Sequence, residues 1–337
     1  MRSQFRKAAV CAVVILAAAC SDGPKLPVLE LRGQTMGTTF NIVLIDPPSG
    51  TTLENLRGRI EEKLEQVEDL ASTYRARSEL AQFNLSASTE WIAVSFEFCS
   101  LISSALLVSQ ETGGAFDITV GPLVNLWGFG PQGGRDRPPA DTDIEAARQQ
   151  VGYTNLDADC GQPAIRKSSA SIYVDLSGWA KGYAVDQLAA LLNTAGLRNY
   201  LVEIGGEVKV RGHNSENRKF AIAIENPSRQ HGKSYSVIRL SDAGTATSGD
   251  YRNFFEYEGT RYSHTIDPGT GRPITHNLAA VTVVHESTAY ADAIATALLV
   301  LGPEDGMRLA DELHLAAYFA VLTPTGVEYR PSARWLF

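Results

Sequence analysis

The chain has 337 residues, of which 44% are hydrophobic and 20% are charged. A chain of this length and composition can bury one large core or two smaller ones, and it is too apolar to be disordered. Its 30 basic residues are outnumbered by 38 acidic ones, which excludes a generally basic surface for binding nucleic acid.

The amino terminus is typical of an export signal. A basic stretch from Arg2 to Lys7 precedes an apolar run at 8–19, which is too short to span a membrane well. Cys20 follows a Leu-Ala-Ala-Ala stretch and resembles the lipidated cysteine of a bacterial lipobox; ordinary secretion or a retained anchor are the alternatives. We therefore predict a signal peptide at 1–19, a lipidated tether at 20–32 and a folded domain at 33–337.

Two further cysteines, Cys99 and Cys160, lie in the predicted folded body. They could pair in an oxidising compartment, but their spacing does not show whether they do. The sequence contains no CxxC motif or Cys/His cluster that would indicate zinc.

Hydrophobic periodicity predicts both strands and helices. Before a Gly- and Pro-rich loop at 128–141, it predicts a strand at 40–45, a helix with apolar positions from Leu53 to Leu70 and a second helix from Phe98 to Leu106. Beyond the loop, it predicts strands at 172–176, 200–210, 220–224, 235–240, 254–258, 281–285 and 318–322, and helices carrying Val185 to Leu192 and covering 289–301 and 304–314. Runs of strands with helices grouped between them favour an α+β fold.

The loop segment GFGPQG at 128–133 matches the dinucleotide fingerprint G-x-G-x-x-G. That fingerprint requires a helix directly after it, whose amide groups bind the pyrophosphate. Here GRDRPP follows, which cannot start a helix, so we predict a Gly-rich loop.

Six separated segments form a series along the chain: GQTMGTTF (33–40), STYRARSELAQFN (72–84), TGGAFDITVGPLVNLWGFG (112–130), YVDLSGWAKGYAVD (173–186), TSGDYRNFFEYEGTRYSHTIDPGTGRPI (247–274) and AYADAIATALLVLG (289–302). Together they resemble the ApbE-type family of FAD:protein FMN transferases. The resemblance runs from about residue 33 to the carboxyl terminus. It implies a mixed sheet or roll with flanking helices, and an FAD site in a cleft between two sub-lobes.

The last segment places Asp292 on a helix, with Ala295 and Thr296 one turn later. A carboxylate, a backbone carbonyl and a hydroxyl on one face offer the hard oxygen ligands that suit Mg²⁺. The alternative is that Asp292 caps a polar helix N-terminus. The resemblance implies that Asp292, Thr296 and the Ala295 carbonyl are metal ligands. Some family members carry Asp at the Ala295 position, so the metal here would have one fewer negative ligand.

The segment YVDLSGWAKGYAVD predicts a strand, a tight turn and a helix. Asp175 ends the strand, Gly178 lies in the turn and Lys181 opens the helix. The resemblance implies that Asp175 and Lys181 contact FAD and that Gly178 gives a metal-binding carbonyl. A solvated lysine after a structural turn is the alternative.

Six further residues match positions where the family binds flavin. A flavin requires an apolar, aromatic slot with a few hydrogen-bonding groups. Met36 and Phe116, taken singly, are typical core residues as well. The implied contacts are Met36, Tyr74, Ala115, Phe116, Asp117 and Ile266.

His264 precedes Asp267 in a turn that contains Pro268 and Gly269. A histidine titrates near working pH, so His264 is a candidate general base. A structural histidine is the alternative, with Asp292 or a metal-bound group taking the proton. Ser248 has no nearby histidine in the sequence, and we interpret its segment as a loop lining the site.

The resemblance implies Mg²⁺-dependent transfer of FMN from FAD to a Thr or Ser hydroxyl of an exported protein, with release of AMP. It implies flavin-bearing subunits of membrane redox complexes as acceptors, such as sodium-pumping NADH:quinone oxidoreductase. A lipid anchor on the periplasmic side of the bacterial inner membrane fits these partners. Two alternatives are an FAD pyrophosphatase and a non-catalytic FAD-binding lipoprotein; the neutral Ala295 is the best support for the latter.

Overall fold

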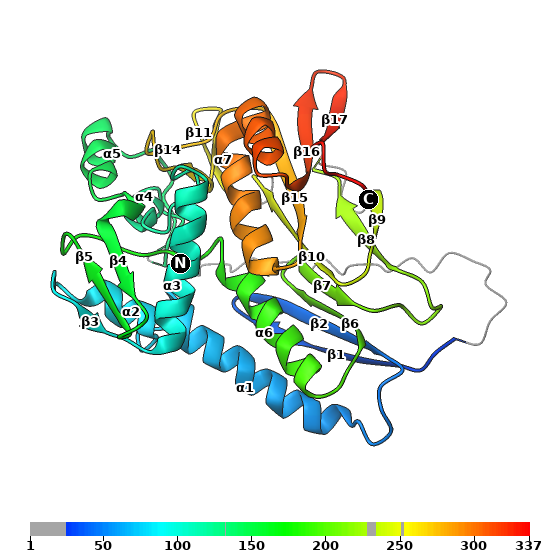
Figure 1. Ribbon diagram of the computed structural model, residues 1–337. Coiled ribbons are helices and arrows are strands. Elements are labelled where there is room, and N and C mark those ends of the chain that lie inside the picture. The colour runs from blue at the N-terminus through cyan, green and yellow to red at the C-terminus, as the bar shows by residue number, and fades with distance from the viewer. Residues whose placement is uncertain (1–24, 132, 228–233, 251–252) are drawn as a thin grey trace, which may run out of the picture.

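The computed structural model describes residues 25–131, 133–227, 234–250 and 253–337 (Figure 1). The predicted signal peptide, the lipidation candidate Cys20 and the first part of the tether lie outside the described residues. Within these ranges, we find no helix with the length and apolar composition needed to cross a membrane.

An eight-stranded sheet forms the centre of the molecule, and each neighbouring pair of its strands is antiparallel. Its strands, in spatial order, are β1 (Val28–Thr35), β2 (Thr38–Ile45), β6 (Asn199–Ile204), β7 (Glu207–Arg211), β10 (Ala243–Gly249), β15 (Leu278–His285), β16 (Ala316–Thr323) and β17 (Gly326–Pro331). Strand β1 includes the last residues of the predicted tether, because they pair in register with β2. The folded part therefore begins earlier than the residue 33 that we expected.

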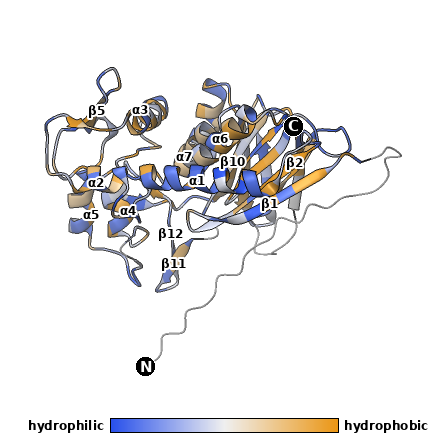
Figure 2. Cartoon of the chain, turned by 90° about the horizontal axis from the view of Figure 1, so that it is seen from below, coloured by the Kyte–Doolittle hydropathy of each residue, from blue (hydrophilic) through white to orange (hydrophobic). Residues whose placement is uncertain are grey.

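Helices cover one face of this sheet. Helix α6 (Ala180–Thr194) packs on β6 and β7, and α7 (Thr288–Glu312) packs on β10 and β15, as Figure 1 shows. Helix α1 (Leu53–Ala71) buries its apolar side, including Leu64, while its outer side is hydrophilic (Figure 2). Helix α7 contains a kink at Gly302, where φ is +80°, so the two helices predicted at 289–301 and 304–314 are two arms of one element.

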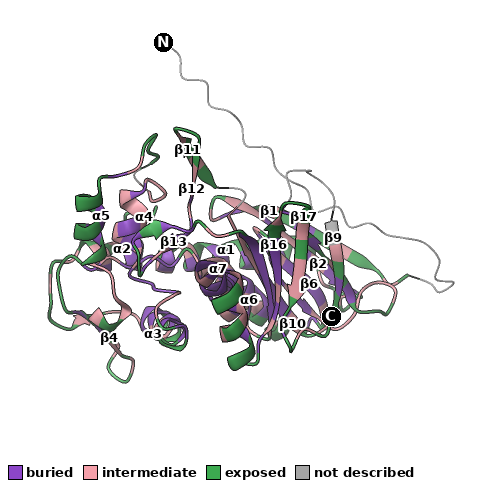
Figure 3. Ribbon diagram, turned by 90° about the horizontal axis from the view of Figure 1, so that it is seen from above, coloured by how far each residue is buried: buried purple, intermediate pink, exposed green. Residues whose placement is uncertain are grey.

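The opposite face of the sheet is covered by a hairpin of β8 (Phe220–Glu225) and β9 (Ser234–Leu240). Because side chains alternate along a strand, Tyr200 and Val202 of β6 pack under the helices while Leu201 packs under the hairpin. Figure 3 shows the resulting buried layers inside the sheet and beneath α7.

The remaining elements form a smaller lobe around α3 (Phe96–Glu111). A disulfide joins Cys99 of α3 to Cys160, which follows β4, and so resolves the pairing that the sequence left open. The other elements are α2 (Glu79–Leu85), α4 (Gly121–Leu126), α5 (Asp141–Arg148), a 3-10 turn (Tyr153–Asn155), β3 (Ile92–Ala93), β4 (Leu156–Asp159), β5 (Ala164–Lys167), β11 (Phe254–Tyr257), β12 (Thr260–Ser263), β13 (Ile266–Asp267) and β14 (Arg272–Pro273).

Three expectations of local structure were wrong. The strand predicted at 200–210 is two antiparallel strands, β6 and β7, joined by the Gly205-Gly206 turn. The segment 172–176 is no strand, because its hydrogen bonds go elsewhere: the Asn84 side chain bonds both backbone groups of Val174, and the Asp175 amide donates to the Ile118 carbonyl at 2.7 Å. The segment around Ser248 is not a loop but part of β10, which consists of small residues paired on both sides. The prediction that GFGPQG at 128–133 is a loop without a following helix was correct. No described residue after Gly128 is helical until Asp141.

Candidate active site

Lys181, Glu207 and Asp292 form a charged group where α6 meets α7 and β7. The Lys181 Nζ lies 2.8 Å from Oε1 of Glu207 and 3.6 Å from Oδ2 of Asp292. Both carboxylate side chains are only 4% exposed, whereas Lys181 is 31% exposed. Lys181 is therefore the member of this cluster whose side chain is most open to solvent.

Burial and charge act on these groups in opposite directions. Burial alone would lower the pKa of Lys181, but Asp292 and Glu207 outweigh it and raise that pKa. Burial raises the pKa of Glu207 above its usual range, and the nearby Lys181 partly offsets this increase. Lys181 therefore remains charged at neutral pH, as binding of a phosphate requires.

The position of Asp292 is fixed by its own helix and by α6. Its Oδ2 atom accepts a hydrogen bond of 3.2 Å from the amide of Gly182. The cap of α7 is Ser287, whose hydroxyl accepts from the Tyr290 amide, and Asp292 lies one turn further on. The structure thus assigns the capping role to Ser287 and leaves the Asp292 carboxylate at the junction of the two helices.

Three of the four predicted metal ligands, Asp292, Ala295 and Thr296, lie on α7, and the fourth, Gly178, lies in the turn that approaches this helix. The Thr296 hydroxyl donates to the Asp292 carbonyl at 3.1 Å and contacts the Ser248 hydroxyl at 3.0 Å. A side-chain carbon added at Gly178 would lie 3.1 Å from that same Thr296 oxygen, so the turn approaches α7 closely. Ala295 is fully buried one residue before Thr296 and has only its carbonyl oxygen to offer.

This donor set consists of one carboxylate, hydroxyls and backbone carbonyls. The described residues contain no group of three or more His, Cys, Asp or Glu side chains that could hold a metal. A protein site with few charged ligands suits Mg²⁺, which completes its coordination with water and substrate phosphates. The oxygen donors of Asp292, Thr296 and the backbone are of the hard type that Mg²⁺ prefers.

The segment with Ala115, Phe116 and Asp117 packs beside the predicted turn. The Phe116 ring lies close to Gly178, since an added side-chain carbon there would be 3.3 Å from Cε2 of that ring. Asp117 is buried, which raises its pKa, and its carboxylate accepts hydrogen bonds from Thr119 and from the Tyr153 amide. The Asp117 side chain therefore fixes this loop, and the Phe116 ring is the part of the segment that reaches the Gly178 turn.

Asp175 is buried and lies at the start of the turn. Its Oδ1 atom accepts from the Ser177 amide at 2.8 Å, which closes the turn that presents Gly178. Oδ1 of Asp175 therefore stabilises the turn. A contact between Asp175 and FAD would use the other carboxylate oxygen, Oδ2.

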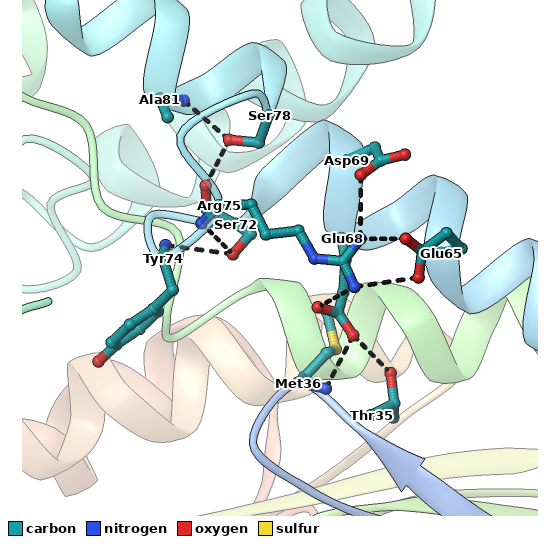
Figure 4. Close-up of polar contacts among 10 residues, drawn as sticks. All are labelled: Thr35, Met36, Glu65, Glu68, Asp69, Ser72, Tyr74, Arg75, Ser78 and Ala81. Carbon is teal, nitrogen blue, oxygen red and sulfur yellow. Dashed lines mark hydrogen bonds and ion pairs between the residues drawn. The ribbon is translucent and has the colours of Figure 1, made fainter.

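Met36 and Tyr74 come from two separate connections, as Figure 4 shows. Met36 lies in the turn between β1 and β2 and is partly buried. Tyr74 lies between α1 and α2, and its side chain is among the most exposed large groups, at 74%. The sulfur and the ring are suited to cover a planar aromatic ligand.

His264 follows β12 and is held by the carbonyl oxygen of Asn253. Both its amide and its Nδ1 atom lie 3.1 Å from that oxygen. A proton on Nδ1 leaves Nε2 with a lone pair, the form a general base requires. Burial lowers the pKa of His264, and the charge of Lys181 lowers it further, so the two groups interact electrostatically.

Two other residues of this segment, Ile266 and Asp267, have structural contacts of their own. Ile266 packs with Trp127 and Leu123 in a small apolar cluster, so its backbone is the part available to FAD. Asp267 accepts from the Gly269 amide and the Thr270 hydroxyl, and thereby closes its own turn.

Sequence reasoning missed Glu207. It is the first residue of β7 and follows the Gly205-Gly206 turn. The alternation of this strand places Glu207 on the same face as the charged Lys209 and Arg211, so the sequence pattern gives no signal that Glu207 is buried.

Comparison with known proteins identifies the family of the chain. The profile of the ApbE family matches residues 36–319. The chain belongs to the ApbE family. A FAD:protein FMN transferase from Vibrio cholerae is 43% identical over 90% of this chain and 91% of its own length, and one from Escherichia coli K12 is 36% identical over 98% and 95%.

Solved structures of ApbE proteins have the same fold. The flavin transferase ApbE from Vibrio cholerae matches with a TM-score of 0.86 and 41% identity, covering 92% of this chain and 98% of that one. The apo form of the Pseudomonas stutzeri flavinyl transferase ApbE matches with a TM-score of 0.85 and 39% identity, covering 92% and 96%. The predicted family and the mixed architecture of sheet and flanking helices are therefore confirmed.

Proposed function

We propose that this ApbE-family chain is a transferase that moves FMN from FAD to a Thr or Ser hydroxyl of an exported protein and releases AMP. The main support for the proposal is that Lys181, Asp292, Thr296 and Gly178 lie close together at the junction of α6 and α7. These groups supply a cation and hard oxygen ligands, which phosphoryl-type transfer requires. The relatives named FAD:protein FMN transferase support the same reaction.

In the proposed reaction, the acceptor hydroxyl attacks the phosphorus on the FMN side of the pyrophosphate. A new phosphoester bond forms, the bond between the two phosphates breaks, and AMP leaves with the electron pair. A bound Mg²⁺, held by Asp292, Thr296 and the carbonyls of Gly178 and Ala295, would neutralise charge on the pyrophosphate.

The residues of the chain have distinct tasks in this reaction. Lys181 binds a pyrophosphate oxygen, and Glu207 keeps its ammonium group in place. His264 accepts the hydroxyl proton at Nε2, because Nδ1 already donates to Asn253. Met36, Tyr74 and Phe116 cover the flavin ring, while Ala115, Asp117, Asp175 and the Ile266 backbone contact FAD at its edges.

The cellular setting is also part of the proposal. The lipobox-like sequence before Cys20 supports a lipid anchor, and an exported enzyme would act on periplasmic proteins of the bacterial inner membrane. Flavin-bearing subunits of membrane redox complexes are the acceptors that fit this location.

The test uses a soluble chain that begins at Ser21, incubated with FAD, Mg²⁺ and a candidate acceptor domain. AMP is followed by chromatography and the acceptor by mass spectrometry. We expect the acceptor to gain one FMN, and Asp292→Ala to abolish the gain. Asp305→Ala is the matched control, because Asp305 lies in the same helix beyond its kink and forms an exposed ion pair with Arg308.

The two alternative functions give different results in this experiment. FMN and AMP without modification of any of several acceptors would indicate an FAD pyrophosphatase. FAD that binds tightly and remains intact would indicate a binding lipoprotein.

A further inference from the structure

Glu68 and Arg75 connect the two segments that carry Met36 and Tyr74 (Figure 4). Met36 is in the turn between β1 and β2, and Tyr74 follows the end of α1. Glu68 lies in the last turn of α1, between these two segments. The Met36 amide is hydrogen-bonded to the Glu68 carboxylate. Tyr74 precedes Arg75 in the sequence, and Arg75 forms an ion pair with the same carboxylate.

Met36 has an unusual backbone conformation that Glu68 stabilises. The two turn residues, Met36 and Gly37, have φ angles of +50° and +72°, as expected for a two-residue hairpin turn. Glycine adopts such angles freely, whereas methionine rarely does. The Met36 amide donates to Oε1 of Glu68 at 3.0 Å, and the Thr35 hydroxyl donates to the same atom at 3.1 Å. Glu68 therefore holds the turn that directs Met36.

Arg75 holds the other oxygen of Glu68. Its Nη2 atom lies 2.7 Å from Oε2 of Glu68. Both oxygens of the Glu68 carboxylate therefore have partners, Arg75 at Oε2 and the β1–β2 turn at Oε1. The Glu68 side chain is 18% exposed and that of Arg75 is 31% exposed, whereas the other partners of Arg75, Glu65 and Asp69, are 62% exposed. Sheltered ion pairs hold a more defined geometry than exposed ones.

The backbone that carries Tyr74 is fixed as well. The amides of Tyr74 and Arg75 both donate to the Ser72 hydroxyl, at 3.2 and 3.3 Å. The Ser78 hydroxyl donates back to the Ser72 carbonyl and also caps α2. An exposed aromatic ring on a fixed backbone is suited to stack on a planar ligand.

We infer that Arg75 and Glu68 are positioning residues that preorganise Met36 and Tyr74 for the flavin ring of FAD. The inference rests on the proposed function, because it assumes that the flavin lies between these two side chains. Neither Arg75 nor Glu68 contacts the reacting phosphate in this account. Both act by fixing the groups that bind the ring.

The first test measures binding of FAD without acceptor, from the change in flavin fluorescence, in Arg75→Ala and Glu68→Gln. We expect the Kd for FAD to rise about tenfold, and kcat at saturating FAD to stay within about twofold of the wild type. Arg57→Ala and Glu61→Gln are the matched controls, since these residues form an exposed ion pair on the same helix. They should leave the Kd unchanged.

A double-mutant cycle separates positioning from a general loss of stability. If Arg75 acts through Met36 and Tyr74, then Arg75→Ala should have little further effect in a Met36→Ala/Tyr74→Ala background. Arg75→Lys should restore part of the affinity, and it replaces Arg75→Ala in the cycle if that variant does not fold.

Two results would overturn the inference. An unchanged Kd in both single variants, or an equal increase in the wild-type and the Met36→Ala/Tyr74→Ala backgrounds, would show that the pair does not position these residues. In either case wild-type FAD binding and AMP release remain intact, and the proposed function stands. A wild-type chain that binds no FAD would overturn the proposed function and this inference together.

Discussion

Gly182 of α6 lies directly against Thr288 of α7. A side-chain carbon at Gly182 would be 2.4 Å from the carbonyl oxygen of Thr288 and 2.7 Å from Cα of Ala289. No atom of a flexible side chain is involved, so neither contact can be relieved without moving a backbone. The absence of a side chain at Gly182 thus sets the distance between the two helices that carry Lys181 and Asp292.

Gly182→Ala should therefore destabilise the protein by about 1–3 kcal/mol, the usual cost of overpacking. It should also weaken activity, because the Gly182 amide bonds the Asp292 carboxylate. Urea unfolding and AMP release measure the two effects. Gly58→Ala is the control: Gly58 lies in α1 with open space around it, and alanine there should stabilise by about 0.5–1 kcal/mol. Equal stabilities of the two variants would contradict this account.

The sequence allowed us to expect that three of the candidate site residues lie close together, whereas it did not give all of the strands correctly. Asp292, Thr296 and Gly178 could be placed together because their segments follow a known series, and helical spacing set Thr296 one turn after Asp292. Strand β10 could not be predicted, because its small polar residues give no hydrophobic alternation. The segment 172–176 has a strand pattern, but an asparagine side chain occupies its hydrogen-bonding groups.

Contacts between residues that are far apart in the sequence could not be predicted either. Glu207 becomes part of the site only because β7 begins beside α6, which brings it to Lys181. The turn at Met36 depends on Glu68, which is 32 residues away. Such pairs follow from tertiary packing, and local patterns in one sequence do not contain them.

Glu207→Gln should change the metal requirement. Lys181 lies closer to Glu207 than to Asp292, so Glu207 limits its competition with a cation for Asp292. Without the Glu207 charge, Lys181 should pair with Asp292 alone. We expect the Mg²⁺ concentration for half-maximal AMP release to rise about tenfold, equivalent to about 1.4 kcal/mol.

The control for this prediction is Glu203→Gln. Glu203 is on the adjacent strand β6 and accepts from the Gly206 amide, a bond that glutamine can keep. It should leave the Mg²⁺ dependence unchanged. If Glu207→Gln shows the wild-type Mg²⁺ dependence, Glu207 does not restrain Lys181.

The disulfide between Cys99 and Cys160 should stabilise the smaller lobe. It closes a loop with a sequence separation of 61, for which the chain-entropy relation gives about 4 kcal/mol. Reduction of the wild type, or a Cys99→Ala/Cys160→Ala double variant, should lower the free energy of unfolding by a similar amount. Reductant should have no effect on the double variant. An unchanged unfolding midpoint in the reduced wild type would contradict the prediction.

The pH dependence of transfer should follow His264. Burial lowers its pKa below the usual 6.5, the Asn253 hydrogen bond opposes this, and the charges of Lys181 and Arg261 lower it further. With His264 as the proposed general base, the neutral imidazole would be the active form, so the rate should be constant at neutral pH and fall only as the pH decreases through a value below 6.5. Because the unfolded chain binds this proton more readily, the free energy of unfolding should also decrease as the pH falls through 6.5.

The measurement is kcat/KM for FMN transfer between about pH 5 and pH 8. In His264→Gln, kcat/KM should be low. It should also no longer decrease at acidic pH, because the imidazole whose protonation causes that decrease is absent. His314→Asn is the control, because His314 is exposed beyond the far end of α7 and should leave the profile unchanged. An acid limb that persists in His264→Gln would assign the proton to another group, with Asp292 the next candidate because it lies beside Lys181.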